Sequence, residues 1–184
     1  NSNIGDPRWN PMRGSNPSSE ITVENVNDLL TAISAGKSTI TLKAGTYDLA
    51  SVADVAEVSD GVLAVTGSLN LVGEEGAALV GGFKISGDAV KTFTLRGLEI
   101  SGAGAIQNLI EIGSKDVAMT SVVLKNNVIS DYNNRLFYMS QEGAVISSYD
   151  MTGNYVHDMG TSGDFSDVRK GGVTAIKMTN TTFA

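Results

Sequence analysis

The chain has 184 residues, a formal net charge of −7, 18% charged residues and no cysteine. This length suits one domain, the lack of cysteine excludes a disulfide framework, and the acidic balance argues against a nucleic-acid partner, which would require a basic surface. The sequence holds no run of 18 apolar residues, so it predicts no membrane-spanning segment.

The first segment differs in composition from the rest of the chain. Residues 1–19 contain all three prolines and the single tryptophan, together with several Asn and Ser residues. Proline lacks the backbone N–H that helix interiors and central strands require. We therefore predict an extended lead-in over residues 1–19 and one folded domain over residues 20–184.

An amphipathic helix is predicted next, over residues 24–35. Asn25 suits the N-cap, and Gly36 suits the first position after the helix. The apolar residues recur at helical spacing and share one face: Val26, Leu29, Leu30 and Ile33.

The rest of the chain repeats one short pattern. Two apolar residues stand two positions apart, a bend residue follows two positions later, and another apolar residue usually follows after three more. The apolar pairs are Ile40/Leu42, Leu69/Leu71, Phe93/Leu95, Val122/Leu124, Tyr149/Met151 and Ile176/Met178. The repeats are spaced by 29, 24, 29, 27 and 27 residues, and such periods are typical of solenoids, propellers or arrays.

The residue types in the repeat distinguish among these architectures. Apolar residues two positions apart lie on one face of a strand. Most bend positions hold Gly or Asn, which adopt left-handed backbone angles most easily: Gly73, Gly97, Asn126, Gly153 and Asn180. Each period leaves room for a third strand, expected around Phe83–Ile85, Ile110–Ile112 and Phe137–Met139.

The pattern therefore predicts an all-β fold, a right-handed parallel β-helix of about six coils. One inward column is expected to contain Leu42, Leu71, Leu95, Leu124, Met151 and Met178. Because a solenoid end exposes an apolar cross-section, we predict that the short helix caps the N-terminal coil. The last repeat ends at Phe183 without a covering segment, so we expect the domain to be C-terminally incomplete.

Two segments carry a family resemblance. The stretch ITVENVNDLLTAISAGKSTITLKAGTYDL, residues 21–49, resembles the opening of pectate-lyase-like β-helix proteins, in particular that of the alginate lyase and chondroitinase B family. The stretches VVLKNNVISD (122–131) and YDMTGNYVHDM (149–159) are similar to coils across that superfamily. The lead-in NIGDPRW is similar to segments of surface lipoproteins from Bacteroidetes-type glycan-utilisation systems.

This resemblance implies a secreted or outer-surface-anchored bacterial protein whose partner is a polysaccharide, acidic polysaccharides included. In the superfamily the third sheet forms the substrate groove, which implies sugar-binding roles for Glu111, Arg135 and Tyr138. No position matches the family's calcium ligands or basic Lys/Arg pair, so we predict no catalytic residue and a non-catalytic recognition domain. Two alternatives stay open: a polysaccharide lyase with catalytic coils beyond residue 184, and a structural adhesin or phage-type rod.

Stacking of the coils also predicts which polar residues become neighbours. Asp131 and Asp158 fall on successive coils, where they could bind Ca²⁺, act as paired glycosidase carboxylates or cap turns. Arg96 and Lys125 should stack, with Lys43 further along the same column, either to bind anionic sugars or as a solvated face. An internal amide ladder is expected from Asn126, Asn127, Asn154 and Asn180.

Overall fold

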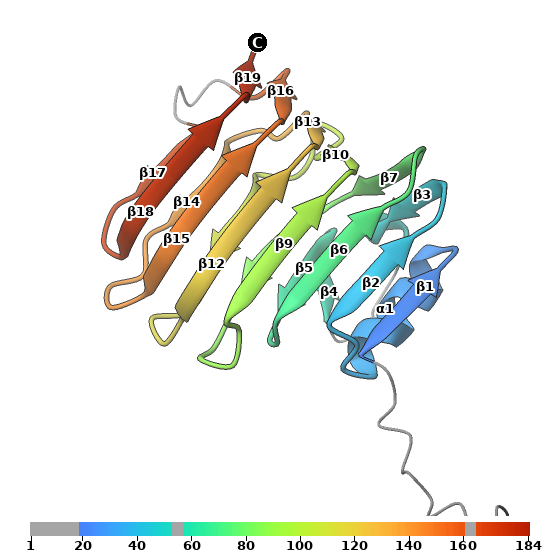
Figure 1. Ribbon diagram of the computed structural model, residues 1–184, viewed down its shortest axis with the longest axis horizontal. Coiled ribbons are helices and arrows are strands. Elements are labelled where there is room, and N and C mark those ends of the chain that lie inside the picture. Colours follow the sequence, from blue (N-terminus) through green and yellow to red (C-terminus); the bar gives the residue numbers. More distant parts are fainter. Residues whose placement is uncertain (1–18, 53–56, 161–164) are drawn as a thin grey trace, which may run out of the picture.

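The computed structural model describes residues 19–52, 57–160 and 165–184. Apart from Ser19, the predicted lead-in lies outside these residues. Within the described ranges the chain winds into a solenoid whose successive coils stack from the N-terminal to the C-terminal end (Figure 1). The predicted all-β class and the parallel β-helix are confirmed.

Three sheets, named A, B and C, run along the solenoid in the described part of the chain. Sheet A contains β1 (Glu20–Val23), β2 (Thr39–Leu42), β6 (Leu69–Gly73), β9 (Thr92–Arg96), β12 (Ala118–Lys125), β15 (Val145–Thr152) and β18 (Gly172–Thr179). Sheet B contains β3 (Gly45–Asp48), β7 (Ala77–Val80), β10 (Glu99–Ser101), β13 (Val128–Ser130), β16 (Tyr155–His157) and β19 (Thr182–Phe183). Sheet C contains β4 (Val58–Ser59), β5 (Val62–Val65), β8 (Gly82–Ile85), β11 (Asn108–Ile112), β14 (Arg135–Met139) and β17 (Ser166–Val168).

Each coil visits the three sheets in the order A, B, C. The complete coils among the described residues are β2–β3–β5, β6–β7–β8, β9–β10–β11, β12–β13–β14 and β15–β16–β17, and β18–β19 begin a sixth. The predicted third strands around Phe83, Ile110 and Phe137 are β8, β11 and β14. The third strand of the fifth coil is β17, which pairs with β14.

Four of the five predicted bends between sheets A and B use left-handed backbone angles, whereas Gly73 ends β6 without a positive φ and the left-handed residue of that corner is Gly76, at +86°. The φ angles are +67° at Gly97, +55° at Asn126, +69° at Gly153 and +47° at Asn180. Glycine, and to a lesser extent asparagine, tolerates this region without a clash of its β-carbon. The chain can therefore turn sharply from one sheet to the next at a single residue.

Immediately inside these bends, two buried amides connect neighbouring coils. Asn127 and Asn154 are 1% and 2% exposed. Asn154 Oδ1 accepts from the Asn127 backbone N–H at 3.0 Å, and its Nδ2 donates to the Leu124 carbonyl at 2.8 Å. Asn127 repeats the pattern one coil earlier, toward Leu98 N and Leu95 O. The predicted ladder is thus confirmed for these two residues, whereas Asn126 and Asn180 are exposed bend residues.

The predicted inward column is wrong in the first coil and correct beyond it. Ile40, rather than Leu42, lies opposite Leu71. From Leu71 onward the column continues as predicted, through Leu95, Leu124, Met151 and Met178. A two-residue shift returns every side chain to the same face, so the hydrophobic pattern alone does not distinguish these two registers.

The second repeat has Gly76 where the other repeats have their last apolar residue. Tyr47 pairs with Leu79 and not with Gly76, because the corner between β6 and β7 is longer than the others. The two-residue shift between β2 and β6 removes Lys43 from the predicted cationic column: Arg96 lies opposite Val72, which lies opposite Thr41.

The predicted helix is α1 (Val26–Ser34), and it packs beside β1, β2 and β3 at the N-terminal end (Figure 1). Asn25 is its N-cap: Oδ1 accepts from the Asp28 N–H at 2.9 Å and Nδ2 donates to the Asp28 carboxylate at 3.0 Å. Leu29, Leu30 and Ala32 are buried. The helix stands where the sequence places it, and its role as a cap stays a prediction.

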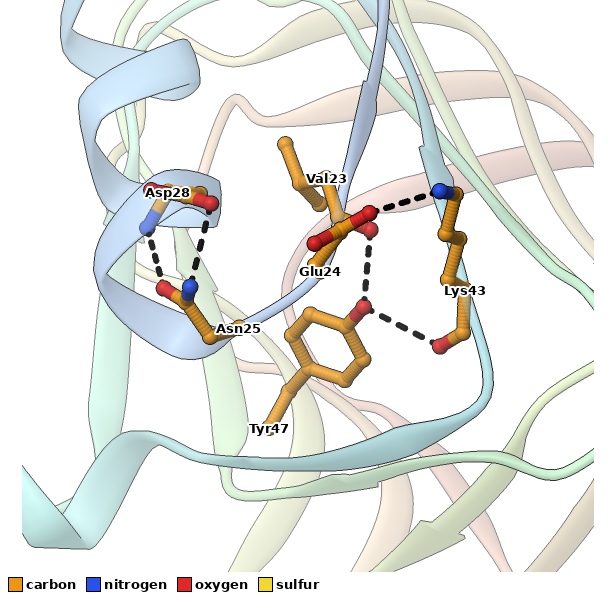
Figure 2. A network of polar contacts seen from close by, with 6 residues as sticks. All are labelled: Val23, Glu24, Asn25, Asp28, Lys43 and Tyr47. Atoms are coloured by element: carbon orange, nitrogen blue, oxygen red, sulfur yellow. Dashed lines mark hydrogen bonds and ion pairs between the residues drawn. The ribbon is translucent and has the colours of Figure 1, made fainter.

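A polar network joins this end to the first coil, as Figure 2 shows. The buried Tyr47 hydroxyl lies between the carbonyl oxygens of Val23 and Lys43, at 2.9 and 3.0 Å. Lys43 Nζ donates to Glu24 at 2.6 Å, and this hydrogen bond lowers the pKa of Glu24 and raises the pKa of Lys43. Burial raises the pKa of Tyr47, so this phenol stays a neutral donor that connects β1 to the β2–β3 corner.

Among the described residues, no helix has the length and the apolar composition that a membrane span requires.

The last strand of sheet A is less buried than the others. In β18, Ile176 and Met178 point along the inward columns but are 59% and 49% exposed. The core proper consists of the coils before β18.

Substitution of Gly153 should test the bend. In Gly153→Val the β-carbon would meet the amide of Asn126 on the neighbouring coil and would sit at positive φ. We expect a loss of about 1–3 kcal/mol in the free energy of unfolding, measured by urea denaturation. The matched variant Gly67→Val, at an open position without positive φ, should change it by less than about 0.5 kcal/mol. Equal stability of the two variants would contradict the bend assignment.

Substitution of Asn154 should test the amide ladder. Asn154→Leu keeps the side-chain size but leaves the Asn127 N–H and the Leu124 carbonyl buried without their partner. We expect a loss of at least about 2 kcal/mol, because each orphaned buried group costs about 1–3 kcal/mol. Asn126→Gly, at an exposed left-handed position, is the control and should retain wild-type thermal stability. A wild-type melting temperature for Asn154→Leu would count against the ladder.

Candidate functional site

One column of polar side chains follows the outer face of sheet C. The register of β8, β11, β14 and β17 places Lys84, Glu111, Tyr138 and Asp167 side by side. Parallel strands lie about 4.8 Å apart, so Glu111 and Tyr138 are near neighbours. The structure thereby brings together two of the three residues that the resemblance implied for a groove on this sheet.

The third residue, Arg135, does not lie exposed beside them as expected. It is 9% exposed, and its Nη2 pairs with Asp167 Oδ2 at 3.1 Å. The same carboxylate oxygen accepts from Arg169 Nε at 2.7 Å. Arg135 is buried because β17 pairs with β14 and thereby brings the Asp167 carboxylate against the guanidinium group.

The two guanidinium groups also cover the Tyr138 ring. The Cζ atoms of Arg135 and Arg169 lie 5.1 and 5.7 Å from the ring centroid, within the range of a cation–π interaction. Tyr138 is half-buried. Arg135, Tyr138, Asp167 and Arg169 therefore form a packed cluster that fixes β17 and the chain after it against sheet C.

A hollow of about 210 Å³ adjoins Glu111 on the same face. Its floor is apolar, with Val62, Phe83 and Ile106, and its polar lining consists of Asp60, Gln107, Asn108 and Glu111. The Asn108 Oδ1 atom is buried and has no hydrogen-bond partner among the described residues. An apolar floor with several converging polar groups is the usual composition of a ligand site.

The side chains that line this hollow offer several hydrogen-bonding groups to a ligand. Carboxylates accept hydrogen bonds from hydroxyl groups, and amides both donate and accept. Among the described residues that line it, none is serine, threonine, lysine or histidine, so the lining supplies no alcohol nucleophile beside a histidine base. The arrangement suits the recognition of a polyhydroxylated ligand.

Sequence reasoning missed Asp60, Gln107 and Asn108. Asp60 and Gly61 form the two-residue turn between the antiparallel strands β4 and β5, with φ angles of +49° and +76°. An Asp-Gly pair between apolar strands is a recognisable hairpin signal. It would have predicted the turn, but only the coil register brings that turn next to β11.

Asp131 and Asp158 lie on successive coils as predicted, since Ser130 pairs with His157 and Asp131 N donates to Asp158 O at 3.2 Å. Their carboxylates bond to different partners. Asp131 accepts from the Ser130 hydroxyl at 2.8 Å, whereas Asp158 lies 2.7 Å from His157 Nδ1. Within residues 19–52, 57–160 and 165–184 no three or more acidic or histidine side chains group as metal ligands would. A Ca²⁺ ion at the pair stays a prediction.

Arg96 and Lys125 are direct neighbours on the outer face of sheet A, as predicted. Both are exposed. They lie on a different sheet from Glu111 and Tyr138, so the structure divides the predicted sugar-binding residues between two faces of the solenoid.

Comparisons with family models, with curated proteins and with solved structures found no match for this chain.

Removal of the Asp167 carboxylate should loosen the cluster on sheet C. Asp167→Asn keeps the shape but withdraws the charge that faces the buried Arg135. Loss of one partner of a largely buried pair is costly, so we expect a loss of about 1–3 kcal/mol in unfolding free energy and a lower melting temperature. Glu24→Gln, which breaks the exposed Lys43 pair, should leave the melting temperature nearly unchanged. Equal effects of both variants would contradict the structural role of Asp167.

Proposed function

We propose that this chain is a polysaccharide-recognition β-helix of a bacterial glycan-utilising system, secreted or anchored at the cell surface, of pectate-lyase-like type and non-catalytic over residues 1–184. The observation that carries the proposal is the hollow beside Glu111 on sheet C, with its apolar floor and its carboxylate and amide lining.

The composition of the hollow favours a sugar over other ligands. Sugar hydroxyls donate to carboxylates such as Glu111 and Asp60, and both accept from and donate to amides such as Asn108. The C–H faces of a pyranose ring pack on apolar side chains, here those of Val62 and Ala105, which are not buried. The orphaned oxygen of Asn108 is an acceptor that a ligand hydroxyl can satisfy once a small side-chain rotation exposes it.

The neighbouring cluster contributes rigidity rather than direct contacts. Arg135, which pairs with Asp167, lies opposite Asn108 on the neighbouring strand, and Tyr138, which the guanidinium groups cover, lies opposite Glu111. Sites on ordered strands hold polar groups at constant separations, and this lowers the entropy lost on binding.

The proposal is tested by affinity electrophoresis of residues 1–184 in native gels that contain neutral or acidic polysaccharides. We expect retardation by at least one polysaccharide, and at least fivefold weaker binding for Glu111→Gln, because an amide cannot replace both acceptor positions of the carboxylate. Glu75→Gln, an exposed turn position with the same change in charge, is the control.

The same samples are assayed for unsaturated products by ultraviolet absorbance. We expect none from alginate, pectate or chondroitin. Robust product formation would favour the lyase alternative, and a complete lack of retardation across the panel would favour the structural rod.

A further inference from the structure

Sheet B carries a second hollow on its outer face, of about 260 Å³. Its floor is apolar, with Ala78, Val80 and Val128, and its polar rim includes Glu99, Asp131 and His157. None of these residues lines the hollow on sheet C. The two hollows are therefore separate sites.

An exposed aromatic platform adjoins the hollow. Tyr155 lies directly opposite Val128 on the neighbouring strand, and these two side chains are 43% and 40% exposed. The Tyr155 ring stacks on the His157 ring, with centroids 4.8 Å apart and an interplanar angle of 26°. Solvent-exposed aromatic and aliphatic groups side by side form an apolar surface about one strand spacing wide, which costs free energy to leave in water.

The polar rim is preorganised. The Asp131 carboxylate accepts from the Ser130 hydroxyl at 2.8 Å and from the Ser101 hydroxyl at 3.4 Å. Asp158 lies 2.7 Å from His157 Nδ1 and thereby orients the imidazole that stacks on Tyr155. Each carboxylate still has acceptor positions for a ligand hydroxyl, because an ionised carboxylate accepts about four hydrogen bonds.

The charge of the lining selects the kind of ligand. The described residues around this hollow include two carboxylates, those of Glu99 and Asp131, and no lysine or arginine. The stacked cations Arg96 and Lys125 belong to sheet A. Uronate or sulfate groups would be repelled here, whereas neutral hydroxyl donors match the acceptors.

We infer that the hollow on sheet B is a second carbohydrate-binding subsite, which takes a neutral sugar unit. The C–H face of the ring packs on Tyr155 and Val128, and the hydroxyls donate to Asp131 and Glu99. The inference does not depend on the sheet C hollow, because the two sites share no lining residue. A chain with both sites could contact one polysaccharide at two places and gain avidity.

The test is affinity electrophoresis in native gels that contain laminarin, galactomannan, xylan or dextran as neutral probes and polygalacturonate as the acidic probe. We expect retardation by a neutral probe, at least fivefold weaker binding for Tyr155→Ala, and near wild-type binding for Tyr155→Phe, which keeps the ring. Polygalacturonate binding should be the same in wild type and Tyr155→Ala. Circular dichroism checks that each variant is folded.

Comparison with Glu111→Gln separates the two sites. Loss of neutral-probe binding in Tyr155→Ala with retention in the control Glu75→Gln supports the sheet B subsite, whatever the effect of Glu111→Gln. Loss in Glu111→Gln alone assigns binding to sheet C and overturns this inference while leaving the proposed function intact. Absence of retardation by every neutral probe, or a concentration-dependent dimer that Tyr155→Ala abolishes, also overturns it.

Discussion

The structure depends on one constraint, the in-register parallel pairing of each coil with the next. A residue in one coil lies opposite the equivalent residue of its neighbours, so a side chain that points inward stacks on others that also point inward. The column from Leu71 to Met151 is completely buried in this way. The burial of apolar area in such columns supplies most of the stabilisation, and no long-range crossing of the chain is required.

The bends and the amide ladder both follow from that constraint. Coils that turn at equivalent positions stack in register, and Gly97, Asn126, Gly153 and Asn180 provide the same left-handed turn in the coils that begin with β9, β12, β15 and β18. The turn would leave backbone groups buried and unpaired. Asn127 and Asn154 satisfy them, each by bonding to the coil before it.

Outward-pointing side chains lie outside the core, and their residue types differ from sheet to sheet. Sheet A presents Arg96 and Lys125 as neighbours, sheet B presents Tyr155 and His157, and sheet C presents Glu111. Since these side chains contribute little to core packing, each face can acquire its own chemistry without change to the fold. Fold and function are therefore separate questions in this protein.

The sequence by itself determined the coil, its bends and its N-terminal helix. The spacing of the apolar residues follows from strand geometry, and the choice of Gly or Asn at a bend follows from backbone sterics. The bends at Gly153 and Asn126 could therefore be placed from residue types alone. The same local logic located Asn25 as the helix N-cap. Register along the later coils was also predictable, because the same apolar pair followed by a Gly or Asn bend recurs in each of them.

Only the tertiary structure decided the first register and the sites. Ile40 and Leu42 are equivalent by pattern, since a shift of two residues keeps both inward, and only the pairing of β2 with β6 places Ile40 opposite Leu71. The burial of Arg135 depends on Asp167, which lies 32 residues later and returns on β17. The hollow beside Glu111 likewise requires Asp60 from a hairpin in an earlier coil. Such contacts join residues that are distant in sequence, so no local preference encodes them, and stacking of the coils creates them.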